Sequence, residues 1–531
     1  MGSKSENPRK VSNGQTDTVS FDLEENFATS TTCHGVAHIF ETKGSRRSMW
    51  FGITLVSTIA CLVQCCIIVY DASLYPTRVN IKVKYNTQSL FPSVTLCNTN
   101  LIASIDNTRE ELKYAMLLYR HYYAKNQITH QELQSAENYF NRVYGKNFSL
   151  EEYVARYRFK AEDMIVSCQW GEEPCGSANF SQVITDYGTC YTFNSGQKGY
   201  PLLYQTISGS SHGLRLAINV QQYVYPTLPL SFLTPDAGIR LSVHHYNEIA
   251  NMGSRGVFVP PGMHGYIAIT DTHVLSNLGP PWGECGQKNL QYFRYYSRSA
   301  CRREFEANLA AQQCNCSYQQ ATGKPPCTIS ESFTCVIPKL INTENKKTLN
   351  SFCPYPCQQT EYPIILSYAG IATNAIIDSS SHNGKLANLL DSVKNDPSKY
   401  PNYTSEAFIR ENLIYLDVYF RELITSTTTE SKATGYAQVL SDVGGQLGLF
   451  IGASIITLCE IITYLCDRCE RKKREKREMR IRRQSQMIRD IMQVGVEKKD
   501  LQTETKPNKN NDFVFNTSED GQETSSTNPN V

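Results

Sequence analysis

The sequence has almost no net charge: 52 Lys and Arg residues nearly balance 50 Asp and Glu residues, which leaves +2 over 531 residues. A chain with this balance has no overall attraction to nucleic acid, and we expect no nucleic-acid partner. Charged residues are few, at 19%, and hydrophobic residues make up 40%, so the composition excludes a disordered chain and a coiled coil. The mean hydropathy of -0.38 excludes a bundle of many membrane spans. One or two spans on a large water-exposed body remain compatible with these values.

Two apolar segments are long enough to cross a bilayer. Residues 49–69 carry no charge, and at 1.5 Å per residue they reach about 30 Å, the thickness of a hydrocarbon core. Residues 443–465 contain a single charged residue, Glu460. A buried helix of a globular domain is the alternative for either segment, but their lengths favour membrane spans. The residues before the first span are mostly polar, so we expect no signal peptide.

Basic residues beside the spans predict the orientation. Lys43, Arg46 and Arg47 precede the first span, and a dense basic run at 471–483 follows the second. Both termini are therefore expected in the cytosol of a multi-pass plasma-membrane protein. The basic run is typical of a solvated face that fixes topology, and it also suits anionic lipid of the inner leaflet. The expected segments are a cytosolic N-terminus (1–48), a first span (49–70), an extracellular domain (71–437), a second span (438–466), and a basic and then disordered tail (467–531).

Twelve of the 19 cysteines fall between the spans. They are Cys97, Cys168, Cys175, Cys190, Cys285, Cys301, Cys314, Cys316, Cys327, Cys335, Cys353 and Cys357. An even number outside the cell predicts six disulfides, and this is favoured over a metal site at Cys314-x-Cys316. We expect no metal and no cofactor. Four glycosylation sequons lie in the same region; Asn147, Asn179 and Asn402 are expected to be modified, whereas Asn315 is constrained between two cysteines.

The extracellular region mixes strands and helices. Segments rich in β-branched and aromatic residues predict strands at 91–98, 214–225, 239–245, 264–275 and 412–423. Apolar periodicity predicts helices at 109–123, 301–313 and 406–413, and the last of these overlaps a predicted strand. The fold class is therefore an α+β membrane protein, in which strands from both ends of the region meet in one sheet.

The second span has an unusual pattern of small and acidic residues. It contains Gly444, Gly445 and Gly448, followed by the tripeptide 452–454 of Gly, Ala and Ser. Small residues permit close helix packing, or they expose backbone carbonyls in an unwound stretch. Asp442 and Glu460, on either side, are unfavourable in a helix that faces only lipid. The pattern favours a cation pathway over a plain packing seam, and two helices per chain require an oligomer to enclose a pore.

These residues resemble the degenerin/epithelial sodium channel/acid-sensing ion channel family. The segment 440–454 is similar to the family's pre-pore and selectivity segment, and His34-Gly35 to its gating dipeptide. Three further segments match: 91–98 after the first span, 236–244 in a palm strand, and 280–285 in a loop near the membrane. The resemblance implies a homotrimer or heterotrimer with finger, thumb, palm, knuckle and β-ball regions. It also implies a sodium-preferring channel that amiloride blocks.

The resemblance assigns roles to individual residues. Gly452, Ala453 and Ser454 match the selectivity filter, Gly448 matches the amiloride position, and Ser441 matches the site where a bulky side chain holds the gate open. Asp442, Gly444, Gly445 and Glu460 belong to the same pore and gate segment. Tyr75 and Trp282 match the aromatic pair that couples the extracellular domain to the first span. Many relatives have a carboxylate where this chain has Thr463, so the exact sodium/potassium preference is left open.

The family's cysteine frame implies a specific pairing, which the spacing alone does not give. The implied pairs are Cys97–Cys190, Cys168–Cys175, Cys285–Cys357, Cys301–Cys353, Cys314–Cys335 and Cys316–Cys327. A further family disulfide lacks both ends here, where Phe305 and Ser351 stand.

The acid-sensing branch of the family uses carboxylate pairs with raised pKa values, and this chain has few candidates. Asp236 is the only acid in 224–238, Glu344 is the only one in 336–352, and Ile207 replaces a palm lysine. These departures favour an organic ligand over protons. Tyrosine-rich segments such as 138–145 suit an extracellular RFamide-type neuropeptide, although core packing explains most of these rings. A bile-acid-sensitive, proton-gated or constitutively active channel is the alternative.

Two other classes share the two-span plan. ATP-gated trimeric channels need a cluster of Lys and Arg for the triphosphate, and none stands out between the spans. Membrane ecto-nucleotidases need glycine-rich phosphate loops, which the glycines after Asp236 and Asp442 resemble only superficially. No catalytic constellation with a spacing signal is present, so we expect no enzyme.

Overall fold

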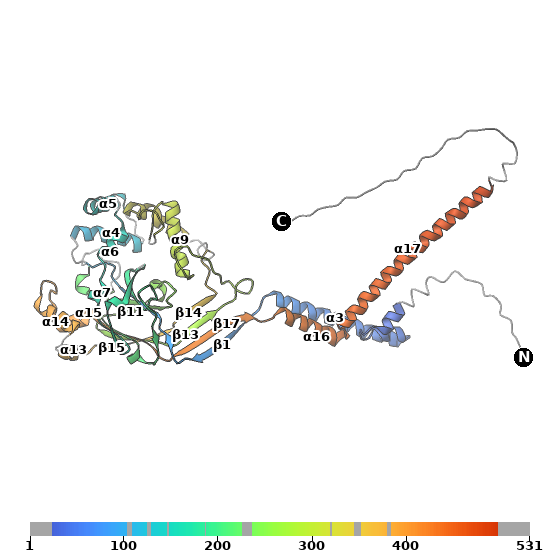
Figure 1. The fold of residues 1–531 in the computed structure, drawn as a ribbon, viewed down its shortest axis with the longest axis horizontal. Coiled ribbons are helices and arrows are strands. Elements are labelled where there is room, and N and C mark those ends of the chain that lie inside the picture. Colours follow the sequence, from blue (N-terminus) through green and yellow to red (C-terminus); the bar gives the residue numbers. More distant parts are fainter. Residues whose placement is uncertain are drawn as a thin grey trace, which may run out of the picture. The chain divides into compact units, whose positions relative to one another are not determined.

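The computed structural model describes residues 24–103, 109–124, 129–145, 148–185, 187–225, 236–318, 321–344, 352–379 and 384–497. The chain divides into two compact units, shown in Figure 1. The first unit, Met1–Val69 with Ala437–Val531, contains both expected spans and is called here the membrane unit. The second, Tyr70–Tyr436, is called the extracellular unit after its expected location.

The described part of the membrane unit is mostly helical. Its helices are a segment at 24–30, α2 (Val36–Glu41), α3 (Ser45–Ser73), α16 (Tyr436–Ile451) and α17 (Ile455–Glu497). The described residues include one helix long and apolar enough to cross a membrane, α3, or two spans if α16 and α17 form one bent span. Apolar side chains of α3, such as Val56 (67% exposed), are largely uncovered in the single chain, as lipid contact requires. The basic run is helical, because α17 continues through it to Glu497.

The extracellular unit is built on four sheets. A four-stranded sheet has the order β1 (Thr77–Tyr85), β17 (Ile424–Lys432), β13 (Thr272–Ser276), β14 (Gln358–Glu361). A five-stranded sheet has the order β11 (Val257–Val259), β10 (Ile239–His244), β3 (Ser93–Asn98), β7 (Gly188–Phe193), β6 (Phe180–Thr185). A six-stranded sheet has the order β15 (Ile364–Gly370), β12 (Met263–Ile269), β16 (Leu413–Phe420), β9 (Leu214–Asn219), β4 (Ile165–Trp170), β5 (Glu173–Cys175). A small sheet pairs β2 (Ser89–Leu90) with β8 (Tyr204–Gln205).

Helices form separate groups around these sheets. The α-helices are α4 (Arg109–Ala124), α5 (His130–Tyr144), α6 (Leu150–Arg156), α7 (Ala161–Met164), α8 (Met252–Arg255), α9 (Arg298–Gln313), α10 (Ile329–Glu331), α11 (Ile337–Glu344), α13 (Thr373–Ser379), α14 (Lys385–Asn395) and α15 (Ser405–Asn412). Shorter turns are η1 (Ser177–Asn179), η2 (Ser210–His212), η3 (Gln222–Val224) and the π-helical η4 (Ser332–Val336). Side chains cap the N-termini of several helices. Thr129 and Glu132 form a capping box at the N-terminus of α5, and Ser297 caps the N-terminus of α9.

The main apolar core combines side chains of the five-stranded and six-stranded sheets. Phe91, Phe193 and Phe420 are almost fully buried in it. A second core joins α4, α5 and α6 to α10, η4 and α11. Six disulfides reinforce the unit: Cys97–Cys190, Cys168–Cys175, Cys285–Cys357, Cys301–Cys353, Cys314–Cys335 and Cys316–Cys327. These pairs coincide with those that the family resemblance implies.

The predicted elements are present in the structure with different boundaries, and the strand expected at 214–225 ends at Asn219 and is followed by the 3-10 turn η3. The expected strand at 264–275 is two strands, because the chain turns at Thr270 and the second part joins the four-stranded sheet. The overlap near 412 resolves at Asn412, where α15 ends and β16 begins. Strands from both ends of the extracellular unit do meet in one sheet, since β1 pairs antiparallel with β17 over nine residues. The expected disordered end of the tail lies outside the described residues.

Candidate functional site

The tripeptide expected to form the filter interrupts the second apolar segment. Gly452, Ala453 and Ser454 lie between α16 and α17, which meet at an angle of 73°. Gly452 has a φ of +68°, a conformation that favours glycine. Ser454 starts the next helix, because its Oγ accepts hydrogen bonds from the backbone N–H groups of Ile456 and Thr457. The sequence reasoning left a straight helix and an unwound stretch open, and the structure has the unwound stretch.

The N-terminal segment packs against this break within the membrane unit. The backbone N–H of His34 donates to the carbonyl of Ile451 (2.9 Å). A Cβ added at Gly452 would lie 2.4 Å from His34 Nδ1, so a larger residue cannot be accommodated without displacing the imidazole. The next residue, Gly35, also has a left-handed φ of +86°, and a Cβ there would lie 2.4 Å from Thr54 Oγ1 on α3. The His-Gly dipeptide is therefore wedged between α3 and the break.

Glu460 is held by the same N-terminal segment. Its Oε2 accepts hydrogen bonds from the Thr32 backbone N–H (2.9 Å) and from the Thr31 hydroxyl (3.1 Å). The Thr32 hydroxyl also lies 2.6 Å from the Thr457 hydroxyl. These hydrogen bonds give partners to a carboxylate that lies within an apolar segment, where an unpaired charge is unfavourable.

The residues expected near the gate lie on α16. Asp442 accepts a hydrogen bond from the Gln438 side chain (2.7 Å), and Ser441 is exposed. A Cβ added at Gly444, Gly445 or Gly448 would meet no atom within 4 Å. In the single chain this glycine face is open, as expected for a helix that approaches another copy closely.

The expected aromatic pair is in contact at one end of the four-stranded sheet. The rings of Tyr75 and Trp282 meet edge to face, with centroids 5.4 Å apart. The ammonium group of Lys432, on β17, lies 3.9 Å from the centroid of the Trp282 ring. Glu430 on the same strand accepts a hydrogen bond from the Leu278 backbone N–H (3.0 Å). The loop that carries Trp282 is thereby tied to β17, which leads into α16.

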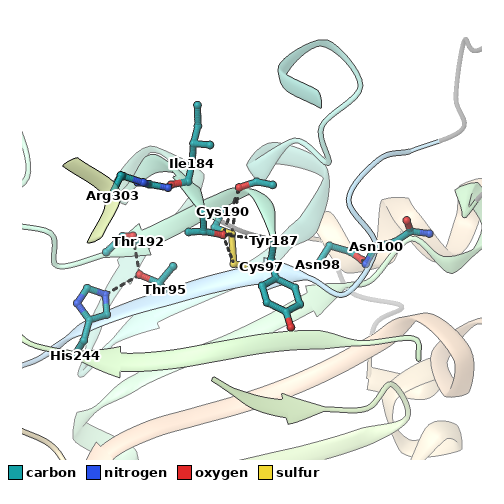
Figure 2. The surroundings of a disulfide bond; sticks show 12 residues. Thr95, Cys97, Asn98, Asn100, Ile184, Tyr187, Cys190, Thr192, His244 and Arg303 are labelled. Carbon is teal, nitrogen blue, oxygen red and sulfur yellow. Dashed lines mark hydrogen bonds between the residues drawn. A yellow bond between two sulfur atoms is a disulfide. The ribbon is translucent and has the colours of Figure 1, made fainter. Parts of the chain in front are cut away.

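Two adjacent histidines, His244 and His245, lie at the end of β10. His244 is buried and its Nε2 lies 2.8 Å from the Thr95 hydroxyl, beside the Cys97–Cys190 disulfide, as Figure 2 shows. Burial lowers the pKa of His244 to about 4, so it is neutral at physiological pH. His245 is partly buried, and burial lowers its pKa too. Both observations agree with a structural role.

Sequence reasoning missed a carboxylate, Glu248. It pairs with Arg255 (3.3 Å), which also pairs with Glu361 (2.8 Å). Burial raises the pKa of Glu248 to about 6, and the nearby Glu361 adds to the rise while Arg255 opposes it. No spacing in the sequence reveals this group, because Glu361 comes from a distant strand, β14.

The comparisons with known proteins agree with these features. The model of the family described as "Amiloride-sensitive sodium channel" matches residues 27–464. The chain is 32% identical to the human bile acid-sensitive ion channel over 458 residues, which cover 83% of this chain and 85% of that protein. It is also 32% identical to acid-sensing ion channel 1 of Gallus gallus over 457 residues, which cover 82% of each chain.

The chain belongs to the amiloride-sensitive sodium channel family. It is therefore a membrane ion channel and not an enzyme, and the ecto-nucleotidase alternative is excluded. Phe305, one of the two positions where the resemblance implies a missing disulfide, packs on Phe352 with ring centroids 4.8 Å apart. Ser351, the other position, lies outside the described residues.

The expected glycosylation sites of this channel are exposed where they are described. Asn179 and Asn402 both have exposed side chains, and Asn147 lies outside the described residues. Asn315 is exposed as well, although cysteines flank it.

Proposed function

We propose that three copies of this chain, or this chain with related subunits, form a sodium-selective plasma-membrane channel that an extracellular ligand opens and amiloride blocks. The break at Gly452–Ser454 carries this proposal, because it places non-helical backbone inside the second apolar segment, which membrane proteins tolerate where the backbone is buried in protein or lines a water-filled pathway. In this arrangement residues 49–70 and 438–466 cross the membrane, and both termini are cytosolic. The basic part of α17 contacts anionic lipid of the inner leaflet.

Gating in this proposal runs through the extracellular unit. Ligand binds the open arrangement better and shifts the population toward it. The Tyr75–Trp282 contact passes the shift to the first span. The second spans then part near Ser441 and Gly448, while Gly452, Ala453 and Ser454 discriminate between cations.

We propose an amidated peptide of the RFamide type as the activating ligand. The stretches 224–238 and 336–352 hold one acidic residue each, Asp236 and Glu344, which supports an organic ligand over protons. The raised pKa of Glu248, to which the nearby Glu361 contributes, counts in favour of protons. Fewer aromatic rings are accessible to a peptide than the sequence indicates, because Tyr139 and Phe140 are buried in the core around α4 to α6. Tyr295, which is 41% exposed, remains available for a peptide.

A bile-acid-like organic anion is the second candidate ligand. It is favoured by an arginine-lined cavity at the base of α9, which is described below.

Whole-cell current in cells that express this chain alone tests the proposal. The cells receive a pH step, an RFamide peptide pulse and a deoxycholate pulse, each with and without amiloride. A peptide-evoked, amiloride-blocked sodium current is the expected result. A current evoked only by acid would refute peptide gating, and silence to all three with protein at the surface would refute this chain as a self-sufficient channel opened by these ligands.

A substitution at Ser441 tests the gate. Ser441→Phe is expected to give a standing, amiloride-blocked current without ligand, because a bulky ring prevents the helices from closing. Ser441→Ala is the matched control and should close normally. A silent Ser441→Phe channel with normal surface expression would contradict the assigned gate.

A further inference from the structure

A cavity of about 460 Å³ lies beside the N-terminus of α9 in the extracellular unit. Its walls come from the segment 244–255 after β10, from the first turn of α9, and from residues 353–359. This volume is within the range of pockets that hold organic ligands, and it exceeds what a single inorganic ion fills. None of the residues proposed for the filter or the gate lines it.

The charges that face this cavity are mainly positive. Arg255, Arg298 and Arg302 line it, and Glu248 is the one carboxylate among its lining residues. Arg255 is already paired with Glu248 and Glu361, and Arg302 is paired with Glu306, a residue outside the lining. A guanidinium group has five N–H donors in a planar fork, so an arginine that pairs with one carboxylate keeps donors for a second anion.

The cavity also has an apolar side. Tyr355 lines it and is 62% exposed, and the Arg298 guanidinium lies 4.0 Å from the centroid of its ring. Ile249 and Pro356 add further apolar surface. A ligand that fits both sides has an anionic group and an apolar body.

The walls are fixed before any ligand arrives. The Cys301–Cys353 disulfide joins α9 to the segment 353–359, and the Cys285–Cys357 disulfide holds the same segment a second time. Arg303 on α9 donates to the Ile184 carbonyl of β6 (2.7 Å), as Figure 2 shows. A preformed pocket loses little entropy when a ligand binds.

One lining arginine links the cavity to the sheet that leads into the membrane helices. Arg255 pairs with Glu361 at the end of β14. β14 pairs with β13, and β13 pairs with β17, which precedes α16. An anion that takes donors from Arg255 weakens its hold on Glu361, so occupancy of the cavity changes a restraint on the four-stranded sheet.

We infer that this cavity binds an amphipathic organic anion, a carboxylate or sulfonate, and that its occupancy regulates opening. The anionic group is held by Arg255, Arg298 and Arg302, and the apolar body lies against Tyr355. The inference that occupancy regulates opening rests on the proposed function as a ligand-gated channel. The inference that the cavity binds an anion is independent of that function.

Direct binding to the full-length channel in nanodiscs tests the site, with deoxycholate below its micellar concentration as the probe. Arg302→Gln and Arg298→Gln are each expected to weaken binding by about tenfold, since each removes a charge-assisted hydrogen bond. Arg410→Gln is the matched control, because Arg410 pairs with Glu406 (2.7 Å) in the same i, i+4 geometry in which Arg302 pairs with Glu306 (2.8 Å). The methyl ester of deoxycholate, which lacks the charge, should bind as weakly to the wild type as deoxycholate binds to the variants.

The outcomes separate the site from the channel function. Equal binding to wild type, Arg302→Gln and empty nanodiscs would overturn the site, because it would show partition into lipid. Absence of binding to the wild type would overturn it too, even if an RFamide peptide still evokes current. Arginine-dependent binding in a channel that passes no current would support the site and overturn the proposed ligand-gated function.

Discussion

The sheets of the extracellular unit differ sharply in how they are stabilised. Every residue of β3 and β7 in the five-stranded sheet is buried, whereas all nine residues of β1 in the four-stranded sheet are exposed in the single chain. Among the described residues, no member of the four-stranded sheet belongs to the main apolar core. The first sheet depends on side-chain packing, and the second depends on its backbone ladder and a few polar contacts.

This difference indicates which part can move. Packed cores resist gradual deformation, while regions with few buried apolar contacts open or shift at lower free-energy cost. The four-stranded sheet contains β1 and β17, the strands that adjoin α3 and α16 in the sequence. We call the four-stranded sheet the mobile sheet, because it should shift at the lower free-energy cost, and two of its strands continue in sequence into α3 and α16.

The largest expected effect comes from the packed frame. Phe193→Ala removes a ring that is 1% exposed and touches Phe91, Trp170 and Phe180, and it should cost about 3–5 kcal/mol of folding stability. Surface biotinylation should then detect little mature channel. Ile81→Ala on β1, whose side chain is 69% exposed, should leave the surface amount near normal. An equal loss of surface channel from both substitutions would show that the two sheets do not differ in how they are stabilised.

Next comes the contact at the end of the mobile sheet. Trp282→Ala removes the edge-to-face pair with Tyr75, a contribution of about 0.5–1.5 kcal/mol, so the half-activating ligand concentration should rise by up to about tenfold. Reversal potentials should show an unchanged sodium preference. A change in selectivity with normal activation would contradict the coupling role.

A smaller effect is expected at Glu430. Glu430→Gln keeps an oxygen that can accept from the Leu278 N–H but loses the charge, so we expect about a twofold rise in the half-activating concentration. Glu422→Gln, an exposed residue before β17, is the control. If both substitutions act alike, the negative charge of Glu430 has no part in transmission.

The smallest effect concerns pH. The pKa of Glu248 is raised to about 6, above its usual 4.5, so the folded state binds more protons than the unfolded state between these values. Stability gained from this group therefore increases as pH falls through 6 toward 4.5, and it is absent at pH 7.4. His244 stays neutral across this window, because its pKa is about 4.

Glu248→Gln should therefore melt slightly higher than the wild type at pH 7.4 and equally at pH 5, measured by thermal unfolding of the purified channel. Glu406→Gln, an exposed partner of Arg410, serves as the control at both pH values. A variant that melts lower than the wild type at pH 7.4 would show that pairing with Arg255 outweighs burial.

Much of this architecture follows from the sequence, because the spacing of apolar residues shows which face of a helix or strand is buried. The buried strand β10 and the helix α9 were predicted to within a few residues. Strand β17 was not predicted, since its run of Thr and Ser lacks the alternation of a half-buried strand. Glu248 and the arginine-lined cavity were missed for another reason: their members come from segments far apart in the chain, and only the tertiary fold brings them together.

The hydrogen bond between Thr32 and Glu460 has a consequence for biogenesis. Its two residues are 428 positions apart, and a ribosome adding 5–20 residues per second needs about 20–90 s to cover that distance. During this interval the N-terminal segment has been synthesised but its partner has not. The final seating of the His-Gly dipeptide is therefore a late step in assembly, after the second apolar segment has left the ribosome.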